Sequence, residues 1–457
     1  MQFAGQRTNL QLQPIGKPFN FLIKLSPDVL PEPDAVLLTG ITPQQVNLDG
    51  ITEAEFLKVF EADIATPDTI FVGFNSVRFD DEFMRFLRYR NFYDAYDWQW
   101  KDGRSRWDLL DLTRLTRALR PEGIKWPFGP DGKATNRLEF LTKVNGLDHQ
   151  HAHDALNDVL ASIALAKLIR DHQPKLFDYV LSMRDKKKVT ALVDGGVPFV
   201  YSSGKYPEEF AKTAVVIKVA DHPNGQGALV YDLHFDPDEF TNLPPKELAK
   251  IWRWQKDPAA KRLPVKTLKP NRCPAVAPLS VLDSASQERI KLDQKTWEAN
   301  AAKLKAAADF PKKLLEAITL METQRQAELL TNEQDVDTQL YDGFFDDHDG
   351  RVRDSVRAAD PTELSRFLPK LHDKRLQALL PLYKARNYPE ALSSDERADW
   401  DKFCAQKLFS GGADSRLAKY FQRLKECATL PQYKDKQFLI EELKLYGESI
   451  MPAEPIA

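Results

Sequence analysis

The first 171 residues alternate between short apolar runs rich in strand formers and stretches whose apolar residues recur at helical spacing. The strand-like runs are residues 21–25 and 70–74, and the helical stretches are residues 53–62, 80–88 and 109–119. Strands that alternate with helices predict a layered α/β domain, and this pattern constrains the fold more than any other feature of the chain.

The character of the sequence changes after Gln173-Pro174. Short β-rich pieces separated by proline and glycine fill residues 189–280 and predict a small β domain. Residues 285–330 have helical spacing, a polar and acidic linker follows, and further helical stretches continue to about residue 450. We therefore expect an α/β domain at 1–173, a β-rich domain at 174–330 and an all-helical domain at 331–457.

At 457 residues the chain is too long for a single core. Its 42% hydrophobic and 29% charged residues are typical of a globular protein, and the net charge of −3 means that a polyanion would have to be met by local basic patches. The three scattered cysteines have no metal-binding spacing and suit a reducing cytoplasm. No signal peptide or membrane-spanning run is visible, so we expect a cytoplasmic protein without membrane contact.

One polar stretch opens an apolar-striped helix and carries a histidine and a carboxylate five residues apart. Asp154 is a natural N-cap, so His153 is expected in the turn before the helix and Asp158 one turn inside it. A base at His153 and a cation-binding carboxylate at Asp158 could act on one phosphate. Taken alone, the stretch favours a plainer interpretation, a capping histidine and a solvated aspartate, because short motifs often match by chance.

A second stretch of the sequence makes the functional interpretation more favourable than the plainer one. Residues 73–82 end a strand at Phe74, make a turn that contains Asn75, and open a helix at Asp80. Loops beyond strand ends are where α/β folds hold ligands, which makes Asp80 a candidate site residue. The plainer interpretation of Asp81 and Glu82 is that they favour the positive end of the helix dipole.

Together with Arg137 and the residues after it, these stretches resemble the bacterial exodeoxyribonuclease I family, in the DEDDh group of 3′→5′ exonucleases. The similarity continues through most of the chain and is weakest at 190–330. It is specific at residues 40–43, 89–94, 105–111, 118–124, 173–179, 271–274 and 339–345.

The resemblance implies an RNase H-like exonuclease domain, an SH3-like middle domain and a helical domain that together encircle single-stranded DNA. It implies that Asp80 and Asp158 are metal-site carboxylates, that His153 is the general base, and that two Mg²⁺ ions are bound, with Mn²⁺ as a substitute. It also implies docking of the acidic C-terminal tail of the single-strand DNA-binding protein, for which Arg120 and Tyr179 match. A monomer is expected.

The sequence departs from the group at its first motif, Asp-x-Glu on the first strand of the sheet. The only Asp-x-Glu here is Asp80-Asp81-Glu82, which already serves as the second motif. Either the true start lies upstream, or the chain folds with a gap and does not cleave. We favour the upstream start, because His153, Asp80 and Asp158 are intact.

Residues 85–143 interleave cations with aromatic rings, a composition that grips phosphates and stacks on bases without regard to sequence. The resemblance implies strand contacts at Arg85, Tyr96, Trp100, Arg114 and Arg137. Core packing is the plainer interpretation of Trp98, Trp107 and Trp126, and a solvated helix face is our interpretation of Arg117. Two further basic runs, residues 184–188 and 261–272, could line a groove, although such runs are usually solvated.

Three functions are compatible with these observations. The leading hypothesis is a Mg²⁺-dependent exonuclease that degrades single-stranded DNA to nucleoside monophosphates during DNA repair. The alternative is a strand-binding chain without hydrolysis, and an RNA-trimming enzyme of the same fold is less favoured. The alternating His149, His151 and His153 could bind zinc, but no fourth ligand lies nearby in the sequence.

Overall fold

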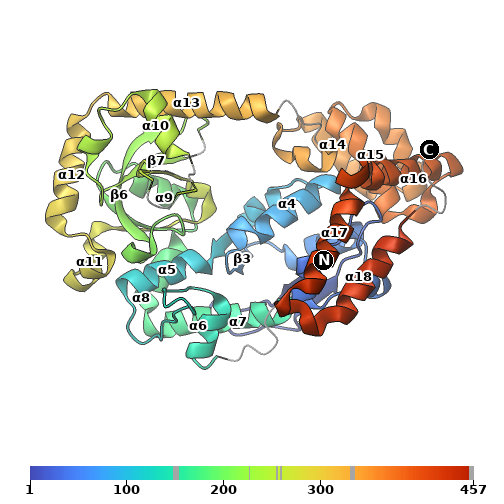
Figure 1. Cartoon of the computed structure of the whole chain (residues 1–457), viewed down its shortest axis with the longest axis horizontal. Coiled ribbons are helices and arrows are strands. Elements are labelled where there is room, and N and C mark those ends of the chain that lie inside the picture. Colours follow the sequence, from blue (N-terminus) through green and yellow to red (C-terminus); the bar gives the residue numbers. More distant parts are fainter. Residues whose placement is uncertain (148–153, 226, 254–255, 258–259, 330–334, 452–457) are drawn as a thin grey trace.

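The computed structural model describes residues 1–147, 154–225, 227–253, 256–257, 260–329 and 335–451. Its elements form an N-terminal α/β region, a β-rich middle region and a C-terminal helical region. Helix α13 (Phe310–Leu329) runs along one side of the molecule from the middle region towards the helical region, and α4 (Asp80–Arg90) crosses the centre (Figure 1). Among the described residues, no helix is both long and apolar enough to cross a membrane.

The N-terminal region contains two separate pairs of strands. Strand β1 (Gln2–Gly5) pairs antiparallel with β2 (Phe19–Leu22), and β3 (Ile70–Gly73) pairs parallel with β4 (Ser105–Asp108). The predicted strands at 21–25 and 70–74 are found, but the first begins two residues earlier and ends three residues earlier than predicted. The Phe60 ring lies 6.0 Å from the Phe3 ring of β1 and 5.8 Å from the Phe71 ring of β3, so the two pairs share an apolar core.

The helices of this region follow from local signals. Thr52 caps α3 in a capping box with Glu55, and Asp108 caps α5, whose leucines are buried. The helices are α1 (Pro33–Thr39), α2 (Pro43–Asp49), α3 (Glu53–Val59), α5 (Leu109–Leu119), α6 (Leu138–Val144), α7 (Ala155–His172), α8 (Pro174–Ser182) and α9 (Lys186–Val193).

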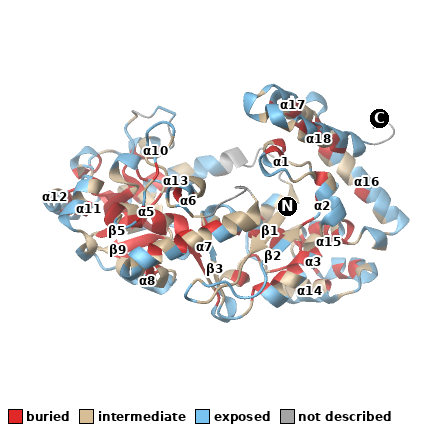
Figure 2. Ribbon diagram, turned by 90° about the horizontal axis from the view of Figure 1, so that it is seen from below, coloured by how far each residue is buried: buried red, intermediate tan, exposed pale blue. Residues whose placement is uncertain are grey.

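The middle region is a five-stranded antiparallel sheet in the order β8-β7-β6-β5-β9. Its strands are β5 (Phe199–Ser202), β6 (Thr213–Asp221), β7 (Ala228–Asp232), β8 (Val265–Leu268) and β9 (Ala275–Pro278). Both faces are buried, because Val215 belongs to the same core cluster as Leu115 of α5, while Val216 belongs to a second cluster with Val189 of α9. Figure 2 shows β5 and β9 as buried strands next to α5. Helices α10 (Pro245–Trp252), α11 (Ser284–Ile290), α12 (Gln294–Ala306) and α13 complete this region.

The C-terminal region is helical, as expected, and Ser393 and Glu396 form the predicted capping box. Its helices are α14 (Asp347–Ala358), α15 (Lys374–Asn387), α16 (Ser394–Phe409), α17 (Arg416–Thr429) and α18 (Gln437–Ser449). Leu376 and Leu380 of α15 pack in one cluster with Tyr89 and Phe92, so the helical region shares a core with the N-terminal region.

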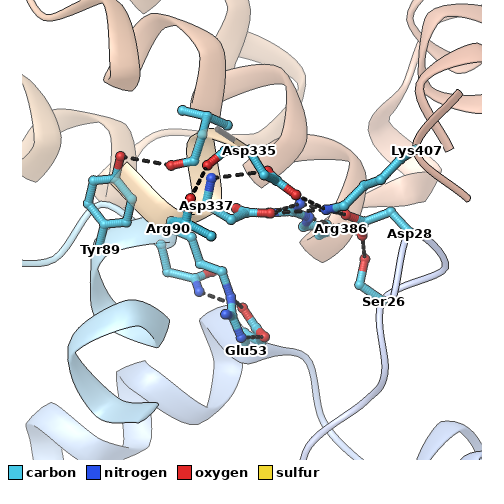
Figure 3. Close-up of polar contacts among 12 residues, drawn as sticks. Ser26, Asp28, Glu53, Tyr89, Arg90, Asp335, Asp337, Arg386 and Lys407 are labelled. Carbon is cyan, nitrogen blue, oxygen red and sulfur yellow. Dashed lines mark hydrogen bonds and ion pairs between the residues drawn. The ribbon is translucent and has the colours of Figure 1, made fainter. Parts of the chain in front are cut away.

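A buried ion cluster joins the same two regions (Figure 3). Asp28, which is fully buried, accepts hydrogen bonds from Arg386 of α15 at 2.6 Å and from Lys407 of α16 at 2.7 Å. Arg386 and Lys407 also pair with Asp337, in the short 3₁₀ helix η9 (Val336–Tyr341) that leads from α13 into the helical region.

Candidate functional site

Asp80 and Asp158 come from the first turns of two different helices, α4 and α7. Asp80 is exposed as a residue, yet enough protein surrounds its carboxyl group that burial, together with the nearby carboxylates of Asp108 and Asp158, raises its pKa to about 6. The fold therefore brings Asp80 and Asp158 together, with Asp108 as a third acidic neighbour.

Asp108 fixes the turn that presents Asp80. One oxygen of its buried carboxylate accepts the backbone N–H groups of Asn75 and Leu110, both at 2.9 Å, and the other accepts that of Val77 at 3.1 Å. Asn75 has a φ of 66°, a left-handed conformation that asparagine tolerates better than most residues. This role of Asp108 was not predicted from the sequence. Its cap on α5 depends on neighbouring residues, but its bonds to residues 75–77 join positions far apart in the chain.

Replacing Asp108 with Asn should destabilise this turn by about 1–3 kcal/mol. The amide oxygen can still accept from Asn75 and Leu110, but the amide N–H₂ group then faces the N–H of Val77 and leaves it without an acceptor. Chemical denaturation of both proteins measures the difference. An Asn variant as stable as the parent would contradict the role assigned to this carboxylate.

The start of α7 is tied to the first strand. Asp154 accepts hydrogen bonds from the N–H groups of Leu156 and Asn157, which confirms the predicted N-cap. Its carboxylate also accepts the side-chain amide of Gln2 at 3.1 Å, and Gln2 in turn accepts the N–H of Ala155 at 3.2 Å. His153, His149 and His151 lie outside the described residues, so the general base and the zinc alternative stay predictions.

The two acids after Asp80 do more than favour the helix dipole. Asp81 is buried and pairs with Arg106, and it lies 3.7 Å from Arg85. Glu82 pairs with Arg85 at 2.5 Å.

Glu82 also connects three regions of the chain. It pairs with Arg272 of the middle region at 3.0 Å and accepts the hydroxyl of Tyr341 in η9. Burial opposes the shift, but Tyr341, Arg85 and Arg272 lower the pKa of Glu82. These long-range partners could not be identified from the sequence.

A cavity of about 960 Å³ opens where the three regions meet, and we call it the central cavity. Three of the predicted strand contacts, Arg85, Tyr96 and Trp100, line it. Trp100 is 65% exposed, and Phe344, for which the sequence predicts no role, is 87% exposed. The further cations of the wall, most of them from the two basic runs, are Arg104, Arg106, Arg184, Lys186, Lys188, Lys269, Arg272 and Arg353.

The other predicted contacts lie elsewhere. Arg114 pairs with Asp111 at 2.5 Å, and Arg137 precedes α6 with a side chain that is 72% exposed. Arg120, at the end of α5, donates to the carbonyl of Val281 at 2.8 Å and lies 3.3 Å from Asp283.

Tyr179, the other residue matched to partner docking, is partly buried on α8, and this burial raises its pKa. Trp98 and Trp107 are core residues, as the plainer interpretation held.

Our interpretation of Arg117 as part of a solvated face is wrong. Its guanidinium donates to the carbonyls of Thr135 at 2.7 Å and Pro127 at 3.1 Å, and it lies over the rings of Trp126 and Phe128. The loop after Pro121 folds back over α5 and covers this face, which helical periodicity alone does not reveal.

Comparison with known proteins agrees with this three-part arrangement. Family models match in the same order: "Exonuclease" at residues 1–166, "Exonuclease I SH3-like domain" at 184–319 and "Exonuclease I C-terminal domain" at 334–450. Exodeoxyribonuclease I of Escherichia coli is 38% identical over 98% of this chain and 94% of that protein. The chain belongs to the exodeoxyribonuclease I family.

Further relatives support the same assignment. Exodeoxyribonuclease I of Haemophilus influenzae is 37% identical over 98% of this chain and 94% of its own length. The crystal structure of E. coli exonuclease I in complex with a dA16 oligonucleotide superposes with a TM-score of 0.91 at 37% identity, covering 98% of this chain and 95% of that chain. Exonuclease I from Methylocaldum szegediense gives 0.89 at 39% identity, over 99% and 95% of the two chains.

The family assignment decides two predictions. The expected order of an exonuclease domain, an SH3-like domain and a helical C-terminal domain is confirmed. The chain is a nuclease, and thus a hydrolase, as predicted.

Proposed function

We propose that this chain degrades single-stranded DNA from the 3′ end and releases nucleoside 5′-monophosphates. The observation that carries the proposal is that the helix of Asp80, whose carboxylate lies near that of Asp158, also contributes Arg85 to a cavity of cations and rings. Arg85 of the cavity wall lies five residues along α4 from Asp80, about 7.5 Å along the helix axis. The complex of E. coli exonuclease I with an oligonucleotide supports the same class of substrate.

The carboxylates fit a hard divalent cation. Mg²⁺ prefers carboxylate oxygens, and Mn²⁺ accepts the same donors. Burial and the neighbouring carboxylates both raise the pKa of Asp80, and a bound cation relieves the repulsion between these carboxylates. We propose that Asp80 and Asp158 hold two Mg²⁺ ions, which when bound supply Lewis-acid stabilisation of the phosphate.

Other residues of the chain are proposed to accept a proton, stack on bases and bind phosphates. His153 is proposed to take the proton from the attacking water. Tyr96, Trp100 and Phe344 would stack on bases, while the cations of the central cavity would hold the phosphates without reading the sequence. Arg114 and Arg137, which lie outside the cavity wall, are proposed as contacts to other parts of the strand.

We also propose that the acidic tail of the single-strand DNA-binding protein docks at Arg120 and Tyr179. A solved structure that combines that protein with exonuclease I, 36% identical to this chain with a TM-score of 0.87, supports such a partner. The cellular setting we propose is DNA repair by a cytoplasmic monomer.

A second candidate function is strand binding without hydrolysis. The cations and rings of the central cavity suit this function equally well, because they can hold a strand whether or not it is cut. Incubating the chain with 5′-labelled single-stranded DNA, with Mg²⁺ or with EDTA, separates the two functions. Metal-dependent shortening from the 3′ end supports the nuclease, and binding without any shortening supports the alternative.

Trp100→Ala should weaken binding of single-stranded DNA by about 1–3 kcal/mol, because an exposed ring on the cavity wall can stack on a base. Fluorescence anisotropy with a labelled oligonucleotide, with EDTA present to prevent cleavage, measures the change. The matched control is Phe438→Ala, since Phe438 is 73% exposed but lies on α18. Equal affinities for the Trp100 variant and the parent would remove this residue from the binding surface.

A further inference from the structure

A second group of metal-ligand side chains lies in the helical region, apart from Asp80 and Asp158. His348 and Asp349 are in the first turn of α14, and His372 is in the turn before α15. One donor atom of each residue lies within 4.8 Å of the donor atoms of the other two. The two imidazole rings are stacked, with centroids 4.1 Å apart and planes inclined by 9°.

Hydrogen bonds fix which ring nitrogens are protonated. Nε2 of His348 lies 2.9 Å from the carbonyl oxygen of Lys370, and Nδ1 of His372 lies 3.2 Å from the carboxylate of Asp346. Because a carbonyl and a carboxylate can only accept, both of these nitrogens must donate. In the neutral rings the remaining nitrogens, Nδ1 of His348 and Nε2 of His372, therefore carry lone pairs.

This arrangement is the one that metal-binding histidines usually have, with the second ring nitrogen donating to a carbonyl or a carboxylate. The buried carboxylate of Asp349 accepts the N–H groups of His372 at 2.8 Å and Asp373 at 2.9 Å. A carboxylate has about four acceptor positions, so these two bonds leave it able to bind an ion. Asp346 and Asp347 add negative charge around the group.

We propose that His348, Asp349 and His372 bind one divalent transition-metal ion, which clamps the start of α14 to the turn before α15. Two imidazole nitrogens and one carboxylate oxygen suit Zn²⁺, Ni²⁺ or Cu²⁺ rather than Mg²⁺ or Ca²⁺. Three protein ligands leave one position of a tetrahedral zinc ion to water. The side chains of His372 and Asp346 are 61% and 55% exposed, so the two can move together. The ring then has room to turn out of the stack while Nδ1 keeps donating to Asp346 and Nε2 directs its lone pair at the ion.

The test is an isothermal calorimetric titration of the whole chain with zinc, in the absence of DNA and Mg²⁺. We expect one zinc ion per chain at this site and at least a tenfold weaker binding of that ion in His372→Ala and in His348→Ala. Zinc should also raise the melting temperature of the parent, and this rise should disappear in both variants. Because His372 is exposed, its replacement should leave the fold intact.

The control is His222→Ala, which removes a histidine of the middle region and should leave zinc binding unchanged. Zinc that binds at the proposed nuclease carboxylates or at the histidines of residues 149–153 would be retained in the His348 and His372 variants. Retention of all zinc by both variants, or no zinc uptake by the parent, would overturn the proposal.

Discussion

Asp158→Asn should lower the Mg²⁺-dependent release of nucleotides from single-stranded DNA by at least about 100-fold, because it removes a charged ligand from the proposed metal site. Affinity for the strand, measured with EDTA present, should change little, since Asp158 lies in the first turn of α7 and the strand is held by the cations and rings of the central cavity. Initial rates on a 5′-labelled oligonucleotide measure the effect.

Asp171→Asn is the matched control, because it makes the same chemical change on an exposed residue near the other end of α7. Calorimetric titration with Mn²⁺ gives a second measurement that does not depend on turnover, and it should show weaker binding in the Asp158 variant. Normal Mn²⁺ binding and a normal rate in that variant would exclude Asp158 as a ligand.

Arg386→Ala should cost about 3–5 kcal/mol in the free energy of unfolding, since breaking one partner of a buried ion cluster leaves uncompensated charge. Arg386 donates to Asp28 and Asp337, both at 2.6 Å, and Asp28 is fully buried (Figure 3). Chemical denaturation measures the loss, with Arg351→Ala, an exposed arginine on α14, as the control. A loss no larger than that of the control would show that Lys407 alone compensates both carboxylates.

The loss of unfolding free energy in Arg386→Ala should depend on pH, because the cluster contains the titratable carboxyl group of Asp28. Burial alone would raise the pKa of Asp28, but Arg386 and Lys407 hold it well below its usual range. A carboxyl whose pKa is depressed on folding contributes stability above its unfolded pKa, about 3.9, and this contribution is lost as the pH falls through the folded pKa. The unfolded state is the same for the parent and Arg386→Ala, so the difference between them should be largest at neutral pH. It should shrink as the pH falls through the range in which Asp28 of the variant, no longer held by Arg386, takes up a proton.

Local signals in the sequence located the candidate site because they determine where helices begin. Asp154 as an N-cap and Asp80 as a first helical residue both follow from neighbouring residues, and these two helix starts place Asp80 and Asp158. The same reasoning could not find the residues that bring the elements together. Asp108 reaches a turn 31 to 33 positions away, and Asp28 pairs with Arg386 358 positions later. Such pairings depend on topology, which no local spacing encodes.

Arg117 shows the same limit of reasoning from local spacing, because here a local pattern led to a wrong prediction. The spacing of cations along α5 predicted a face turned to water, but a loop that folds back over the helix supplies carbonyls and rings to this arginine. The aromatic and basic composition of residues 85–143 was informative as a whole, since Arg85, Tyr96 and Trp100 do line the central cavity. It did not separate the residues of the cavity wall from Arg114 and Arg137, which do not line the cavity.

The division of the N-terminal strands into two pairs offers a place where a further strand could pair. Within the described residues, β1 pairs only with β2 and β3 only with β4, and Val72 of β3 is 47% exposed. The edge of a strand presents a row of backbone N–H and C=O groups that another extended segment can bind. A short extended peptide that pairs with β3 should therefore bind to the chain and raise its melting temperature.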